Sequence, residues 1–371
     1  MEFIKRCWAE ISTQNLISNL NKIRSHTNTN VICVVKANAY SHGDIQVMDI
    51  LQKNGVTDFA VASVEEGIHL RGNGCTGNIL VLGSCLLEHI PYAVKNNITL
   101  TVCSVDFATE LSNYAVKNSC SVNIHIKLNT GMNRIGINCT DLDKTTEQIK
   151  QIYALKNLNV LGVFTHFAVS DEQDGGDFTN NQIKTLLNVK ERLTKDGVNI
   201  GCWHSANSGA IINYPNAHLD AVRAGILLYG CYDSFGADSS YKPVLSLKST
   251  ITHINTLSKG ESVSYGLTYT CDKPIKTATV SIGYADGLPR SLSNKGSVLI
   301  NGNVCKIVGR VCMDQIVVDV TDIDCGVGDT VVIIGSDGKK TITATDIAAL
   351  DNTISYEVLC RISPRVTRVY K

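Results

Sequence analysis

The sequence VVKANAYSHG, residues 34–43, places a lysine directly after an apolar run that begins at Val31. A lysine at the end of a buried strand is costly to desolvate unless its charge is removed. A Schiff base between Lys36 and a carbonyl cofactor would remove the charge, and a desolvated lysine is also a usable nucleophile. The alternative is a plain lysine whose ammonium reaches solvent from the strand end.

Short apolar runs recur outward from this stretch and predict eight strands. They cover residues 32–36, 58–62, 79–82, 99–103, 122–128, 160–166, 202–204 and 221–226. Segments with helical spacing lie between them, for example residues 45–52, residues 107–116 and the segment after Asp177. About eight alternations of strand and helix are typical of an α/β fold of the TIM-barrel type.

Polar residues stand near the ends of four of these predicted strands, namely Lys36, Lys127, His166 and Arg223. The carboxyl ends of barrel strands build the active site in this architecture. We therefore expect the four side chains to surround one mouth of the barrel.

The pattern changes after about Gly236. Short β-branched runs at residues 244–250, 277–282, 297–300, 316–320 and 330–334 are divided by turn residues. Asn301-Gly302 and Asp337-Gly338 are hairpin-type turns. We expect a TIM-barrel domain over residues 1–236 and a C-terminal, mostly β domain over residues 237–371, with residues 1–10 able to pack against the second domain.

The composition excludes several classes of protein. Lys+Arg and Asp+Glu both number 34 in 371 residues, which argues against a nucleic-acid or membrane-surface partner. No apolar run reaches the length of a transmembrane helix, and residues 1–10 lack the apolar core of a signal peptide. The 14 cysteines are scattered, which predicts reduced, buried thiols and no metal site. We expect a cytoplasmic protein or a cytoplasmic domain of a membrane protein.

The stretch around Lys36 closely resembles the pyridoxal-phosphate lysine motif of alanine racemases, VVKANAYGHG, with Ser41 in place of a glycine. Other segments resemble further motifs of that family. They are VSYGLTY (263–269), KLNTGMNRIG (127–136), WHSANS (203–208), GYADGLPR (283–290) and CMDQ (312–315). The resemblance runs from residues 8–11 to residues 356–360, which is nearly the whole chain.

The resemblance implies a homodimeric racemase that uses pyridoxal 5'-phosphate and interconverts L- and D-alanine for peptidoglycan precursors. Racemisation requires a base on each face of the substrate, because the α-proton leaves one face and returns to the other. The resemblance assigns these roles to Lys36, which also carries the cofactor, and to Tyr265 of the partner subunit. On its own, Tyr265 could equally be a tyrosine packed in a loop of the β domain.

The resemblance also implies how the cofactor is held. Arg223 would face the pyridine nitrogen, and its donor-only guanidinium would keep that nitrogen unprotonated. His166 would lie beside the ring and hydrogen-bond Arg223. The residues implied for the phosphate are Tyr40, Asn207 and Ser208 at a helix start, Gly225, Ile226 and Tyr356. A structural ion pair for Arg223 and a plain helix cap for Ser208 are the alternatives.

For the substrate, the resemblance implies that Arg134 and the Met313 backbone bind the carboxylate and that Lys127 can be carbamylated. Asn129 stands where the family usually has aspartate, so one local charge is missing. The residues implied for the corridor that leads to the site are Tyr284, Asp171, Arg290 and Arg310.

Three other functions compete with an alanine racemase. One is a serine racemase of the vancomycin-resistance type, because an apolar pocket separates alanine from serine poorly. Another is a non-catalytic pyridoxal-phosphate carrier, which would lack a β domain with a residue like Tyr265. The third is a barrel decarboxylase, which Arg223 disfavours because those enzymes carry an acidic residue at its position.

Overall fold

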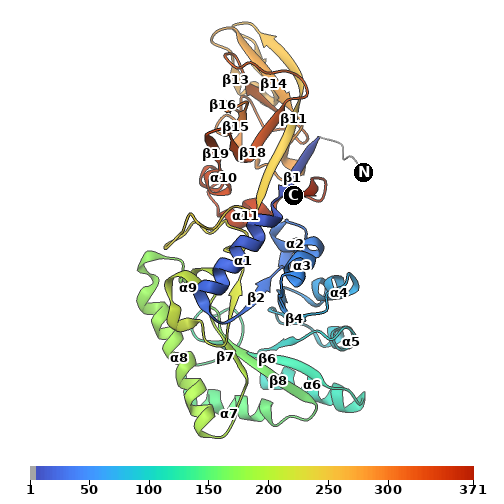
Figure 1. The fold of residues 1–371 in the computed structure, drawn as a ribbon, viewed down its shortest axis with the longest axis vertical. Coiled ribbons are helices and arrows are strands. Elements are labelled where there is room, and N and C mark those ends of the chain that lie inside the picture. The colour runs from blue at the N-terminus through green and yellow to red at the C-terminus, as the bar shows by residue number, and fades with distance from the viewer. Residues whose placement is uncertain (1–5) are drawn as a thin grey trace.

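The computed structural model describes residues 6–371 and shows two domains arranged along the long axis of the molecule. The barrel domain contains the blue, green and yellow part of the chain in Figure 1, and the β domain contains the orange and red part. The first described strand, drawn in blue, lies with the β domain.

Eight parallel strands form a nearly closed barrel. Their order is β4 (Asn78–Val81), β3 (Asp58–Val61), β2 (Asn30–Val34), β10 (Ala221–Ala224), β9 (Cys202–His204), β8 (Leu158–Phe164), β6 (Val122–Asn129) and β5 (Leu100–Val102). Between β4 and β5 the closure is limited to a parallel bridge from Leu80 to Thr99. The TIM-barrel prediction is confirmed, and the predicted strands differ from the observed ones mainly at their ends.

Helices on the outside of the barrel connect these strands (Figure 1). They are α1 (Thr13–Thr27), α3 (Asp44–Lys53), α4 (Val64–Gly72), α5 (Ile90–Lys95), α6 (Val105–Lys117), α7 (Leu142–Tyr153), α8 (Gly176–Lys195) and α9 (Ser208–Asn213). Polar side chains cap several of their amino ends, as when Ser12, Ser63, Ser104 and Asp141 accept N–H bonds from the first turn. The buried face of α8 includes Leu186, Val189 and Leu193 as its spacing predicts.

The C-terminal domain is mostly β. Its strands are β11 (Leu245–Leu257), β14 (Ile275–Val280), β15 (Ser297–Ile300), β16 (Asn303–Lys306), β17 (Ile316–Asp319), β18 (Thr330–Asp337), β19 (Lys340–Ile342) and β20 (Thr367–Tyr370). A small hairpin, β12 (Ser262–Val263) and β13 (Tyr269–Thr270), and two helices, α10 (Ala344–Asp351) and α11 (Ser355–Cys360), complete it. The predicted hairpin at Asn301-Gly302 joins β15 to β16, and both of its residues have positive φ.

The described chain begins in the sheet of the C-terminal domain. Strand β1 (Cys7–Ile11) lies between β11, to which it is antiparallel, and β20, to which it is parallel. The polypeptide therefore passes from the β domain into the barrel and later returns. The domain boundary near residue 236 stays a prediction.

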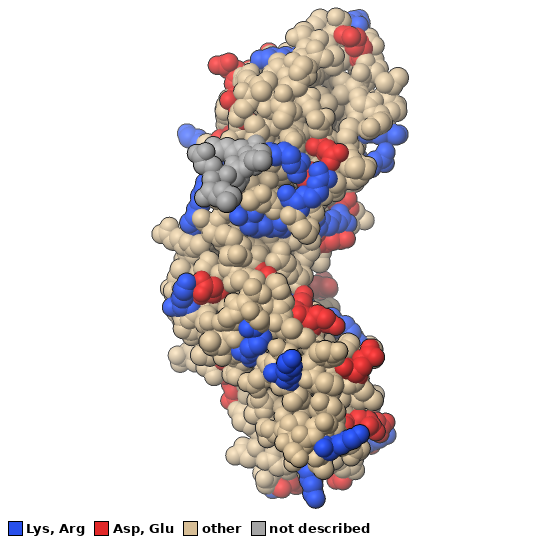
Figure 2. Space-filling view, turned by 90° about the vertical axis from the view of Figure 1, so that its right-hand side faces the viewer, with Lys and Arg blue, Asp and Glu red and all other residues tan. Residues whose placement is uncertain are grey.

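Charges of both signs are dispersed over the face drawn in Figure 2, and several Lys and Arg side chains gather near the junction of the two domains. Within residues 6–371, no helix is long and apolar enough to cross a membrane. The same residues contain no group of three or more His, Cys, Asp or Glu side chains that could hold a metal ion.

Candidate active site

A cavity of about 260 Å³ opens at the carboxyl ends of the barrel strands. All nine residues that the sequence analysis assigned to the cofactor line it: Lys36, Tyr40, His166, Asn207, Ser208, Arg223, Gly225, Ile226 and Tyr356. Asp171, predicted for the corridor, also lines it. The fold thus brings these side chains together, while their individual roles stay predictions.

Lys36 stands at the start of a left-handed turn. Strand β2 ends at Val34, and the turn labelled α2 (Lys36–Tyr40) follows. Every residue from Ala37 to Ser41 has φ between 51° and 65°, although none of them is glycine. Each such residue costs roughly 1–2 kcal/mol relative to the right-handed form. A run of five therefore requires strong support from the surrounding structure.

Side chains of the barrel supply part of that support. The Glu66 carboxylate accepts one hydrogen bond from the Ala37 N–H at 2.8 Å and another from the Ala62 N–H at 2.6 Å. The buried His42 ring places Nδ1 3.0 Å from the carbonyl oxygens of both Ala39 and Tyr40. Since carbonyls only accept, Nδ1 carries the proton.

The C-terminal domain braces the same turn from the other side. Arg368 on β20 donates from Nε to the Ser41 carbonyl at 3.0 Å, and the Tyr370 hydroxyl donates to the His42 carbonyl at 2.9 Å. Ser41, the departure from the family motif, keeps a left-handed backbone at φ 65° and donates its hydroxyl to the Cys360 carbonyl at 3.3 Å. The serine therefore retains the loop shape and adds a contact between the domains.

The electrostatic surroundings favour a neutral Lys36. Burial lowers the pKa of Lys36, the positive charges of Arg134 and Arg223 lower it further, and Glu66 and Cys360 oppose the shift. A lowered pKa increases the fraction of free amine at neutral pH, which suits a nucleophile and a base.

Hydroxyl groups gather at one end of the cavity. The Ser208 Oγ accepts hydrogen bonds from the Gly225 and Leu227 N–H groups, each at 3.2 Å, so its own proton remains available for donation. The preceding residue, Asn207, caps α9 by accepting from the Ala210 N–H at 3.0 Å. Gly225 lets the hydroxyls converge, because a Cβ there would lie 2.8 Å from the Tyr40 oxygen.

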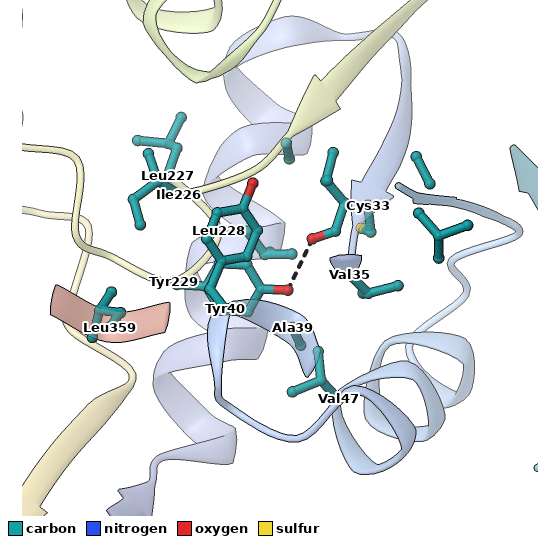
Figure 3. Close-up of a cluster of buried hydrophobic side chains, with 14 of the residues drawn as sticks. Cys33, Val35, Ala39, Tyr40, Val47, Ile226, Leu227, Leu228, Tyr229 and Leu359 are labelled. Atoms are coloured by element: carbon teal, nitrogen blue, oxygen red, sulfur yellow. Dashed lines mark hydrogen bonds between the residues drawn. The ribbon is translucent and has the colours of Figure 1, made fainter. Parts of the chain in front are cut away.

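Three tyrosines support this end. The ring centroid of Tyr40 lies 5.0 Å from that of Tyr229 and 6.2 Å from that of Tyr356. Figure 3 shows Tyr40 and Tyr229 in a cluster with Ile226 and Leu359, where the Tyr229 hydroxyl donates to the Val34 carbonyl at 2.9 Å. Burial raises the pKa of both Tyr40 and Tyr356, so their hydroxyls stay protonated and can donate to an anion.

Arg223 is buried and lines the cavity. Its guanidinium donates to the carbonyls of Thr165 (2.8 Å), His204 (3.2 Å) and Ser205 (2.9 Å) and to the Nδ1 atoms of His204 (2.8 Å) and His166 (3.1 Å). No carboxylate of the described chain is among these partners, so the ion-pair alternative is not supported. Burial lowers the pKa of Arg223 to about 9, which still leaves it protonated at neutral pH.

Lys127 is a buried cation without a carboxylate among the partners that the described chain provides. It donates to the Leu128 carbonyl at 2.6 Å and to the Ile135 carbonyl at 3.4 Å, and its Nζ lies 5.6 Å from the Phe164 ring centroid. Burial, Arg223 and Arg134 lower the pKa of Lys127 to about 8. The site would therefore favour a neutral or anionic group at this position.

Asn129 shapes the loop that carries Arg134. Its side-chain oxygen accepts from the Gly131 N–H at 3.3 Å and from the Asn133 N–H at 2.9 Å. This local turn explains how an uncharged residue serves where the family usually has aspartate. The Arg134 side chain is exposed.

The remaining predicted residues form a separate loop cluster on the β domain, which contains Tyr265, Tyr284, Arg310 and Met313. The Ser264 hydroxyl donates to the Arg310 carbonyl at 2.7 Å, and the Tyr284 N–H donates to the Cys312 carbonyl at 3.0 Å. None of the four lines the cavity of its own chain. The side chains of Tyr265 (70% exposed), Met313 (52%) and Tyr284 (43%) face solvent. Arg290, in the turn after Tyr284, is also exposed.

Family models describe both domains. The model for "Alanine racemase, N-terminal domain" matches residues 11–233, and the model for "Alanine racemase, C-terminal domain" matches residues 244–370. The chain belongs to the alanine racemase family. Together the two matches leave only short segments of the chain uncovered.

Relatives in the alanine racemase family agree over the full length. Alanine racemase 1 of Clostridium acetobutylicum is 40% identical over 372 residues, which cover 99% of this chain and 96% of the relative. The solved alanine racemase of Clostridium difficile 630 is 40% identical with a TM-score of 0.94, covering 100% of this chain and 97% of that one. A histidine racemase from Leuconostoc mesenteroides is 30% identical with a TM-score of 0.90, covering 99% and 98%.

Sequence reasoning missed several residues that matter to this alanine racemase-type cavity. Glu66 was hidden because a glutamate on an exposed helix start looks like an ordinary capping residue. His204 was within a quoted motif, but its contact with Arg223 depends on the order of the barrel strands. Cys360 and Leu82 line the cavity as well.

Proposed function

We propose that this member of the family is a pyridoxal 5'-phosphate-dependent alanine racemase, an isomerase that interconverts L- and D-alanine. The observation that carries the proposal is the single cavity that holds a lysine of lowered pKa, three hydroxyl donors and a donor-only arginine. The D-alanine would supply peptidoglycan precursors. The 14 free cysteines support a place in the reducing cytoplasm.

The residues present fit pyridoxal phosphate. The protonated hydroxyls of Tyr40, Ser208 and Tyr356 suit its phosphate, and the amine of Lys36 suits its aldehyde carbon. When bound, the cofactor supplies the electron sink that makes the α-proton of an amino acid removable. Arg223 can only donate, so it would meet a ring nitrogen that keeps its lone pair.

The second base would come from another subunit. Tyr265 is 70% exposed and does not line the cavity of its own chain, yet a racemase needs a base on each face of the substrate. We infer a twofold homodimer in which the loop cluster of one chain closes the cavity of the other. Leu267, which is 67% exposed beside Tyr265, would be covered by this contact.

In this arrangement Lys36 and Tyr265 would exchange protons with the α-carbon, one on each side. Arg134, exposed in the loop above Lys127, would bind the substrate carboxylate together with the Met313 backbone N–H of the partner. Asp171 at the cavity and Tyr284, Arg290 and Arg310 from the partner's loops would form the corridor.

The other functions receive less support. The family matches and the named relatives favour alanine over serine as the main substrate, so a resistance-type serine racemase is not favoured. A non-catalytic carrier of the barrel alone does not explain the matched C-terminal domain with Tyr265.

The kcat/KM for alanine should exceed that for serine by at least about tenfold, which is the usual effect of one mismatched contact between substrate and pocket. Histidine should be a still poorer substrate. L-alanine, L-serine and L-histidine are offered to one purified sample, and the D-products are quantified. Equal or faster turnover of serine would contradict the proposed substrate. The absence of turnover with all three, in a sample that holds the cofactor, would contradict the proposed activity.

Carbamylation of Lys127 is the modification that its surroundings favour. The neutral amine would bond to the carbon of CO₂ and release one proton, so a buried cation beside Arg134 and Arg223 would become an anion. Since the neutral amine is the reactive form and its pKa is about 8, the modification should increase as the pH rises toward and through that value.

Protein equilibrated with ¹³C-bicarbonate should show a carbamate carbon in its NMR spectrum, and the signal should weaken as the pH falls from about 8 toward 6. The Lys127→Met variant should lack the signal and should show a raised KM, because Arg134 would lose its partner. A signal that persists in the variant would assign the carbamate elsewhere.

A further inference from the structure

A row of side chains crosses the barrel interior from the cavity to the opposite, amino-terminal end. The His166 Nδ1 lies 3.1 Å from one guanidinium nitrogen of Arg223, and the His204 Nδ1 lies 2.8 Å from another. On the far side of His204, its Nε2 lies 2.9 Å from the Nδ1 of His125. We call these four residues the histidine–arginine row.

The donor pattern along this row follows from arginine. A guanidinium has N–H groups and no acceptor, so the Nδ1 atoms of His166 and His204 must both be unprotonated. The neutral His204 ring then carries its proton on Nε2 and donates it to His125. His125 accepts at Nδ1, and its own proton lies on Nε2. Every ring therefore has one allowed tautomer, and reversing any of them would bring two donors together.

Hydrogen bonds fix the protons of these rings, and packing fixes the positions of the rings themselves. The Phe164 ring stacks on His204 with centroids 4.9 Å apart and an angle of 5° between the planes. The same ring lies 5.4 Å from the guanidinium carbon of Arg223. Next to His125 stands Gly162, where a Cβ would approach the imidazole to 2.7 Å. The close contact between β6 and β8 thus requires glycine at this point.

The outer end of the row reaches a second cavity, of about 300 Å³, at the amino-terminal floor of the barrel. It is lined by Ile32, Phe59, Leu80, Leu161, Cys202 and His125, among others. His125 is 8% exposed. Burial and the charge of Arg223 lower its pKa to about 4, although Asp58 at the floor opposes the shift. His125 is therefore neutral at physiological pH, as the row requires.

We propose that His125 is a positioning residue that acts through His204 to hold Arg223 in its orientation toward the cavity. His125 does not line the candidate active site, and it reaches Arg223 only through His204. Without the acceptor at His125, the Nε2–H of His204 would be buried and unpaired, so the ring would lose the contact that holds it against rotation away from Arg223. Arg223 would then lose a fixed acceptor on its inner side. The proposal rests on the proposed function, because the role of Arg223 does.

The test compares two substitutions of His125. His125→Leu removes the acceptor and keeps an apolar side chain, whereas His125→Asn retains an acceptor close to the ring position. The matched control is Thr101→Val, which removes another buried hydrogen bond inside the barrel, from the Thr101 hydroxyl to the Val81 carbonyl at 2.6 Å. Protein labelled with ¹⁵N-histidine is prepared with its cofactor, and the imidazole nitrogens report each tautomer by NMR.

In the unsubstituted protein, His166 and His204 should both show an unprotonated Nδ1 and a protonated Nε2. His125→Leu should shift the ring nitrogens of His204 and also those of His166, which lies two contacts farther along the row. His125→Asn should restore both patterns, and Thr101→Val should leave them unchanged. A protonated Nδ1 on His204 in the unsubstituted protein would overturn the inference. Unchanged ¹⁵N chemical shifts of His204 and His166 in His125→Leu would also overturn it.

The kinetic arm should show a kcat lowered about tenfold in His125→Leu with KM nearly unchanged, and a recovery to within about twofold in His125→Asn, as expected for the loss and return of one buried hydrogen bond. If the kcat of His125→Leu equals that of the Thr101→Val control, His125 has only a structural role and the inference is wrong. The spectra decide the donor pattern even if alanine is not turned over, so failure of the proposed function can be told apart from failure of this inference.

Discussion

Mixing two inactive variants, Lys36→Ala and Tyr265→Ala, should restore alanine racemisation. Each variant alone should lose at least about a thousandfold in kcat, because each lacks one of the two bases. In a mixed dimer, one site combines both substitutions and the other has Lys36 from one chain and Tyr265 from its partner. Activity per mixed dimer should therefore reach up to about half that of the unsubstituted enzyme, by twofold symmetry.

Two controls accompany the mixing. Borohydride should fix pyridoxal phosphate to Lys36 in the Tyr265→Ala protein and should fix none at that position in Lys36→Ala. The fold should survive Tyr265→Ala, since this side chain is 70% exposed. If differently tagged subunits exchange and activity does not return, the site is not shared between subunits and the proposed dimer is wrong.

Arg223→Lys should impair both stability and turnover although it conserves the charge. The guanidinium contacts five acceptors, four of them buried, whereas an ammonium offers three protons from a single point. At least two acceptors would lose their hydrogen bond from residue 223, so the free energy of unfolding should fall by about 2–4 kcal/mol. We expect kcat/KM to fall by a hundredfold or more, at about 1.4 kcal/mol for each factor of ten.

The control for this prediction is Arg134→Lys. Arg134 is exposed, so its replacement should leave the unfolding free energy unchanged and raise KM for alanine. Urea unfolding and steady-state kinetics on both variants separate the two effects. A stable and fully active Arg223→Lys protein would show that the hydrogen bonds of the Arg223 guanidinium are dispensable. Arg223→Glu is a poorer test, because a carboxylate would face the carbonyls of Thr165, His204 and Ser205.

The barrel could be predicted because each of its strands is marked by a pattern within a short stretch of sequence. Each strand is a short apolar run between turn residues, and the polar residues at strand ends share one face as soon as the strands are parallel. That rule predicted four residues around one mouth, of which Lys36, His166 and Arg223 line the cavity and Lys127 does not. The nine cofactor residues followed from the motifs, which extend over nearly the whole chain.

Features that depend on distant parts of the chain could not be predicted. Propensity does not favour a left-handed run of five non-glycine residues after Lys36, and the turn depends on contacts with distant residues such as Glu66 and Arg368. The tautomers of His125 and His204 likewise depend on the register between β6, β8 and β9. Nor could one chain alone reveal that Tyr265 lies outside the cavity that it is proposed to serve.

The support that β20 gives to the lysine turn makes the order of synthesis matter. Arg368 and Tyr370 are synthesised after the whole barrel, yet they bind the backbone at Ser41 and His42. A ribosome-bound chain can complete its barrel strands well before these two residues emerge from the exit tunnel. During that interval the turn after Lys36 would lack its contacts with Arg368 and Tyr370. A nascent chain, or one cleaved before β20, would therefore have a folded barrel in which Lys36 is not yet held in place. Competence for catalysis would thus report that translation has passed β20.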